Sequence, residues 1–104
     1  MANPYAGEVE LVLNGRSHSA KLTLGALAEL EARLETASLA DLVARFDSGE
    51  MRARDVLELL AAGLRGGGWQ GELSDLVTAE IEGGPLEAAR VAARLLALAF
   101  RVPQ

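Results

Sequence analysis

Residues 8–24 of the chain read EVELVLNGRSHSAKLTL, and this stretch decides how the fold begins. In its first half, hydrophobic side chains recur at every second position, at Val9, Leu11 and Leu13. A period of two residues is typical of a strand that buries one face. Asn14-Gly15 follows. Both residues tolerate the positive φ angles of a type I′ turn, so the pair is a strong signal for a hairpin.

The second half of the stretch returns as another strand, which we predict from Arg16 to about Thr23. The hydrophobic residues expected on one face of this strand are Ala20, Leu22 and Leu24. A two-stranded ribbon alone is only marginally stable in water, so its apolar face must pack on helices or on another chain. We therefore predict a β-hairpin over residues 7–24 and a packed helical part after it.

After the hairpin the hydrophobic period becomes that of α-helices, and we predict about five short helices over residues 25–101. The first helix carries a stripe formed by Leu24, Leu27, Leu30 and Leu34. Helix starts are predicted from residue types that cap or begin helices, namely Thr23, Ser38 with Asp41 in capping-box spacing, Ser74 and Pro85. The predicted fold class is α+β, mostly α, in a single domain over residues 1–104.

The last predicted helix, from about Pro85 to Phe100, has two apolar faces. One face carries Leu86, Ala89, Ala93, Leu96, Ala97 and Phe100. The other carries Val91, Leu95 and Leu98. Two such faces predict a central helix that is buried on both sides.

The charge and hydropathy of the chain argue against nucleic-acid and membrane partners. The 104 residues include 15 acidic and 10 basic side chains, which gives a net charge of −5. Nucleic-acid-binding domains usually carry a basic face, so we expect no nucleic-acid partner. The first residues lack a basic segment followed by an apolar one, and no apolar run approaches the ~18 residues of a membrane span. We expect no membrane segment and a cytoplasmic location.

No constellation of catalytic residues is visible, so we expect no enzyme, no cofactor and no metal centre. The chain has no cysteine and one histidine, whereas a metal site needs three or four convergent ligands. We expect that histidine, His18, near a strand end or on the strand face opposite Leu22. The run Gly66–Gly68 follows a helix and lacks the residues of a P-loop, which indicates a helix end and a flexible loop.

The second and third predicted helices resemble a helix-turn-helix, with Arg52 and Arg54 at the entry to the third. Four acids surround these arginines, namely Asp47, Glu50, Asp55 and Glu58. The local field is therefore not positive, and we interpret the segment as a charged turn. The spacing of Asp55 and Glu58 is typical of a solvated helix face.

Three hydrophobic residues are candidates for binding a partner. Trp69 stands in a glycine-rich loop, where a tryptophan either folds back over the edge of the core or anchors an interface. Phe100 and Val102, near the end of the chain, present the same two alternatives.

Three blocks in order carry a resemblance to a known family: Leu22–Glu31, Asp55–Arg65 and Glu87–Leu96. With the opening hairpin, they resemble the small tail protein of gene transfer agents. These agents are phage-like particles of alphaproteobacteria, and their small tail protein is classed with phage tail assembly chaperones. The resemblance covers nearly the whole chain. One departure is local, since Arg52 stands where a small polar helix cap is expected.

The resemblance implies a non-enzymatic role. Such chaperones bind the long, largely helical tape-measure protein before the tail tube polymerises around it, and they are released as tube subunits arrive. The implied partners are the tape-measure protein and, as a second one, the tail tube protein. We expect apolar helix faces to cover hydrophobic repeats of the tape measure.

Two other functions stay open at this point. One is a structural minor tail component, such as a connector or terminator. The other is a small DNA-binding regulator that uses the second and third helices. A homo-oligomer is also open, because the hairpin has an unpaired edge and the last helix has two apolar faces.

Overall fold

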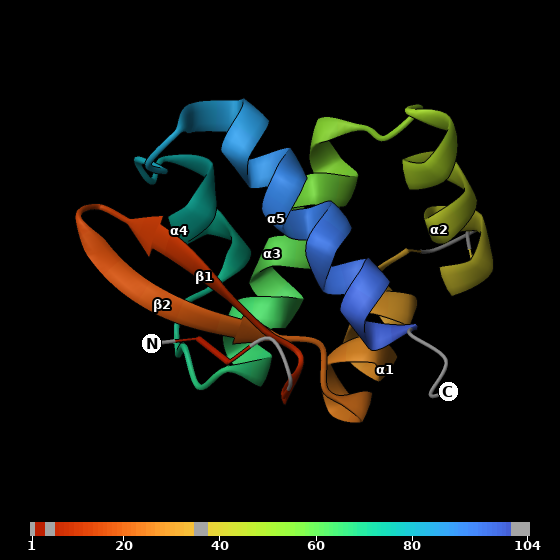
Figure 1. The fold of residues 1–104 in the computed structure, drawn as a ribbon, viewed down its shortest axis with the longest axis horizontal. Coiled ribbons are helices and arrows are strands. Elements are labelled where there is room, and N and C mark those ends of the chain that lie inside the picture. The colour runs from red at the N-terminus through yellow and green to blue at the C-terminus, as the bar shows by residue number, and fades with distance from the viewer. Residues whose placement is uncertain (1, 4–5, 35–37, 101–104) are drawn as a thin grey trace.

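Over residues 2–3, 6–34 and 38–100, which the structure describes, a two-stranded antiparallel hairpin precedes five helices (Figure 1). The structure is a computed structural model. The strands are β1 (Glu8–Leu13) and β2 (Arg16–Lys21). The helices are α1 (Leu24–Arg33), α2 (Leu39–Ser48), α3 (Ala53–Gly66), α4 (Leu73–Val77) and α5 (Gly84–Ala99). The predicted fold class is confirmed.

The hairpin forms as the alternating pattern predicts. Leu13 pairs with Arg16 across a two-residue turn, and Asn14 and Gly15 have φ angles of 49° and 80°. Positive φ at both central residues makes the turn type I′. The side chains on the inner face of β1 are buried, namely Val9, Leu11 and Leu13.

The hairpin is shorter than the predicted 7–24, and the prediction for Leu24 is wrong. β2 ends at Lys21, and Thr23 already caps α1, because its Oγ1 accepts a hydrogen bond from the Ala26 amide at 3.0 Å. Leu24 then lies in the first turn of the helix and is 85% exposed, while Ala26 and Leu30 face the core. The cap sets the rotation of the helix and so decides which leucines are buried.

The central helix is α3, and the prediction that α5 is buried on both sides is wrong. β2, α1, α4 and α5 all pack against α3. The buried hydrophobic residues of α3 are Leu59, Leu60, Ala61, Ala62 and Leu64. α5 crosses in front of α3 in Figure 1. It buries Val91 and Leu95 of one predicted face and Leu96 of the other, whereas Leu86 of that other face is 84% exposed.

The end of α3 lies directly against the backbone of β2. A Cβ atom built on Gly66 would be 2.0 Å from the carbonyl oxygen of Lys21, and one on Gly67 would be 1.9 Å from that of Ser19. Only glycine permits so close an approach. The glycine run therefore ends the helix as predicted, and it also provides the contact between α3 and the hairpin, which the sequence did not indicate.

A short extended segment adds to the open edge of β1. Ile81 forms an antiparallel bridge with Leu13, and the flanking backbone groups bond at 2.8 Å (Asn14 N to Glu80 O) and 3.1 Å (Glu82 N to Val12 O). The pairing ends at Gly83, where a φ of 88° turns the chain into α5. The segment thus covers only the part of the edge nearest the turn.

The predicted start of α4 at Ser74 is wrong by two residues. The Glu72 amide donates to Asp75 Oδ2 at 2.7 Å, which makes Glu72 the N-cap. Asp75, three residues after the cap, accepts from the backbone amide of the cap residue, which is the half of a capping box that the third-position side chain supplies.

Substitution of Gly66 by alanine tests the contact between α3 and β2. We expect Gly66→Ala to lower the free energy of unfolding by about 1–3 kcal/mol, because the new methyl group meets backbone that cannot rotate away. Gly25→Ala is the matched control: Gly25 is also helical, and its Cβ would meet no atom closer than 3.9 Å. Urea unfolding followed by circular dichroism measures both. Equal stability of the two variants would contradict the contact.

Candidate partner-binding surfaces

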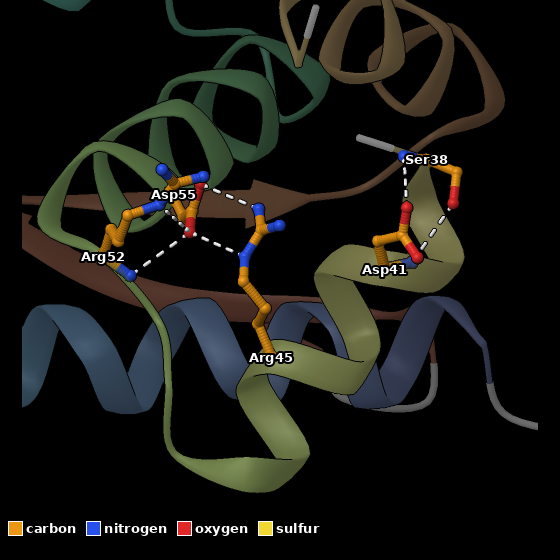
Figure 2. Close-up of polar contacts among 5 residues, drawn as sticks. All are labelled: Ser38, Asp41, Arg45, Arg52 and Asp55. Atoms are coloured by element: carbon orange, nitrogen blue, oxygen red, sulfur yellow. Dashed lines mark hydrogen bonds and ion pairs between the residues drawn. The ribbon is translucent and has the colours of Figure 1, made fainter. Parts of the chain in front are cut away.

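α2 begins and ends as its sequence predicts. Ser38 and Asp41 form a reciprocal capping box, with both side chain–amide distances at 3.2 Å (Figure 2). Gly49 ends the helix with a φ of 78°, in the left-handed conformation that suits a glycine cap. α2 lies at the side of the domain in Figure 1.

An ion pair between Arg45 and Asp55 connects α2 to α3. Arg45 of α2 contacts both carboxylate oxygens of Asp55, with Nε at 3.2 Å from Oδ2 and Nη2 at 3.1 Å from Oδ1 (Figure 2). The Arg52 amide also donates to Asp55 Oδ2 at 3.2 Å. Such two-pronged arginine–carboxylate contacts are among the stronger hydrogen bonds in proteins. Asp55 therefore caps α3 and positions α2 at once.

The expectation that Asp55 and Glu58 lie on a solvated face is wrong. The two residues are only 3% and 5% exposed, and Arg45 reaches Asp55 from α2. Arg45 and Asp55 are ten residues apart on different helices, so no sequence spacing could have shown their contact. α2 and α3 are the two helices that resembled a helix-turn-helix. Between them, Arg45 is bound to Asp55 of the same chain.

Trp69 is half-buried and packs against the hydrophobic core. Its indole lies over Gly71, where a Cβ atom would be 2.1 Å from Cζ2 of the ring. The arrangement matches a tryptophan folded back over the edge of the core. Phe100 directly follows α5 and is 45% exposed, and Val102 lies outside the described residues.

The predicted α5 face that begins at Leu86 is open except at Leu96, which is 4% exposed. We call it the outer α5 face, and its residues are Leu86, Ala89, Ala93, Ala97 and Phe100. Leu86 is 84% exposed, and the three alanines are exposed or half-buried. The two large side chains at its ends are separated by about 21 Å along the helix, at 1.5 Å per residue. Small residues between them would let another helix approach closely.

A groove of about 510 Å³ runs between β1 and α5. We call it the β1 groove, and its charged lining consists of Glu8, Glu10, Glu82, Glu87, Arg90 and Arg94. Arg90 donates two hydrogen bonds to Glu87, at 2.8 and 2.7 Å. These bonds hold the pKa of the Glu87 carboxyl below its usual value. The charges of Glu87 and Arg90 cancel. The other charged residues of the lining are three glutamates and Arg94, so the groove is acidic.

Over residues 2–3, 6–34 and 38–100, no three His, Cys, Asp or Glu side chains form a group that could hold a metal ion. His18 pairs with Leu11, so it lies half-buried on the inner sheet face. We expected His18 on the face opposite Leu22, and this expectation is wrong, since alternate residues of a strand share a face.

Among the helices that the structure describes, none has the length and hydropathy that a membrane span requires.

Comparison with protein families matches residues 6–102 to the family described as "Phage tail tube protein, GTA-gp10". The match spans almost the whole chain. The chain belongs to this family. It is a phage tail assembly chaperone-like family of gene transfer agents, and it is not a family of enzymes. Comparison with curated proteins and with solved structures gives no significant match.

Removal of Arg45 tests how this GTA-gp10 family member holds α2 in place. We expect Arg45→Met to lower the free energy of unfolding by about 1.5–3 kcal/mol, the range for hydrogen bonds to a charged group. It leaves buried Asp55 with the Arg52 amide and the longer contact to Arg52 Nε at 3.6 Å. Arg33→Met is the control. Arg33 is about half exposed and pairs with Glu29 at 3.6 Å, so we expect a loss within about 1 kcal/mol. Urea unfolding measures both variants, and similar losses would contradict the role of the ion pair.

Proposed function

We propose that this protein is a tail assembly chaperone that binds the tape-measure protein of its phage-like particle while the tail assembles. Membership in the GTA-gp10 family carries the proposal. The open outer α5 face supports it, because a chaperone for a long helical client needs an unpartnered apolar surface. The chain is thereby assigned a role in shielding a client rather than in chemistry.

The outer α5 face suits a helical client. An amphipathic helix docks along another helix through residues spaced three and four apart. Leu86, Ala89, Ala93, Ala97 and Phe100 have this spacing. The alanines allow close approach, and the two large side chains would fix the register at either end.

The size of this face predicts weak binding for each copy. Full burial of a large apolar side chain contributes roughly 1.5–3 kcal/mol, and the face offers two of them. Association costs about 4–15 kcal/mol in lost translational and rotational freedom. One copy would therefore leave the client readily, as release during tube growth requires. Many copies on repeated segments of one client would act together.

Two matched leucine variants test the proposed face. Leu86 and Leu24 are 84% and 85% exposed, and both lie in the first turn of a helix. With the tape-measure protein co-expressed, we expect Leu86→Glu to reduce the amount recovered in a pull-down several-fold, because a carboxylate cannot be buried in an apolar contact. Leu24→Glu should leave it unchanged.

The control experiment is expression of the tape-measure protein alone. We expect it to be less soluble without the chaperone. If it is equally soluble alone and the two proteins do not co-purify, the proposed function is wrong. If both glutamate variants bind like the parent protein, the client contacts another surface.

A structural tail component is the second candidate function, and the family description favours it by naming a tail tube protein. The two functions differ in what the finished particle contains. We expect quantitative mass spectrometry of purified particles to find the chain absent or far below one copy per tube subunit, because a chaperone is released on assembly. Stoichiometric amounts would support the structural role.

A further inference from the structure

The outer edge of β1 has backbone groups available for another strand. In a hairpin with a two-residue type I′ turn, hydrogen-bonded and non-hydrogen-bonded pairs alternate from Leu13–Arg16 onward. The backbone N–H and C=O groups of Glu8, Glu10 and Val12 therefore point away from β2. The bond from Glu82 N to Val12 O confirms this direction.

Only part of this edge is paired within the described residues. The Glu8 amide donates to Asn3 O at 3.0 Å, and Val12 O accepts from Glu82. Between these two bonds the Glu10 amide and carbonyl and the Val12 amide face outward. Strand geometry gives the stretch from Glu8 to Val12 a length of roughly 13 Å, at 3.3 Å per residue.

The β1 groove lies where the added pairing stops. Residues 80–82 run along the edge until Gly83 turns the chain into α5. Val12, Glu82 and Gly83 line the groove together with Glu8 and Glu10. If the extended segment 80–82 continued along β1 past Gly83, it would therefore run through the groove.

We propose that the β1 groove binds an extended segment of a partner protein, which adds as a strand to the edge of β1 and carries basic side chains at alternate positions. Backbone hydrogen bonds to Glu10 and Val12 hold the segment. Glu8, Glu10 and Glu82 attract its basic residues. Arg94 is the one lining cation outside the Glu87–Arg90 pair.

Charge disfavours a second copy of this chain as the occupant. Pairing of two β1 edges around a two-fold axis would bring Glu8 and Glu10 of one copy beside those of the other. Cross-strand neighbours lie about 4.5–5.5 Å apart, and like charges at that distance are destabilising. Acidic residues at a sheet edge also protect against self-association in natural proteins. A different, basic segment relieves this repulsion.

This inference does not depend on the proposed function. It is carried by the backbone of β1 and the charges of the groove, whereas the chaperone role uses the outer α5 face. Failure of the pull-down with Leu86→Glu would leave the groove untouched. Conversely, an unoccupied groove would leave the chaperone role unaffected.

A synthetic peptide tests the groove directly. The probe is a capped heptapeptide of alternating Val and Lys, and its control replaces each Lys by Glu. In nuclear magnetic resonance titrations of the full chain, we expect the Lys peptide to shift the amide signals of Glu10 and Val12. The Glu peptide should not shift them. Binding should weaken as salt is added, because exposed charges are screened.

Two pairs of variants separate the backbone from the charges. Val12→Pro removes the outward amide without removing a bond to β2, and Val12→Ala keeps that amide. We expect Val12→Pro to bind the Lys peptide about 3- to 10-fold more weakly than Val12→Ala, the effect of one hydrogen bond. Glu82→Lys should weaken binding, whereas Glu50→Lys, an exposed acid that does not line the groove, should not.

Each contrary outcome overturns the inference. The inference is wrong if neither amide shifts at millimolar peptide, if the Glu peptide binds equally well, or if the shifts map to the outer α5 face. Concentration-dependent dimerisation through β1, seen by sedimentation, would make a second copy the occupant instead. Circular dichroism checks that Val12→Pro is folded, and Glu82→Lys keeps the test open if it is not.

Discussion

The fold depends on the contact between the end of α3 and the backbone of β2. Gly66 and Gly67 leave room for the carbonyl groups of Lys21 and Ser19, at positions where any side chain would collide with them. This close approach places β2 on the central helix, and α5 packs against β1, so the inner face of β1 is buried although the sheet has only two strands. The hairpin and α3 therefore stabilise each other through the contact between β2 and α3.

The same arrangement leaves two neighbouring surfaces open. α5 packs on α3 and β1, and its outer face carries Leu86 and Phe100, which are 84% and 45% exposed. β1 is bonded to β2 on one edge and only in part to residues 80–82 on the other. A domain of this size cannot cover every apolar face and strand edge. In a protein of a tail assembly family, such surfaces are where partners are expected to bind.

Local signals predicted most of the elements, and contacts between distant residues explain the errors over Asp55 and α5. Asn14-Gly15, Thr23 and the Ser38–Asp41 pair work within a few residues, and each was predicted correctly. Asp55 was misread because its partner, Arg45, lies on another helix. The outer α5 face was expected to be buried, since periodicity reveals that a face is apolar and not whether anything covers it. The candidate Trp69 packs on the core, whereas Phe100 lies at the end of the open face.

The hairpin, the order of the described helices and the family were predictable from the amino-acid sequence, because they follow from turn chemistry, hydrophobic period and the order of blocks along the chain. The three-dimensional packing was needed to show which helix is central, which apolar face stays open, and that a groove follows the edge of β1. Those features depend on how close two backbones can approach and on which charges meet across helices. Neither the approach of the backbones nor the pairing of the charges can be read from the spacing of residues along the sequence.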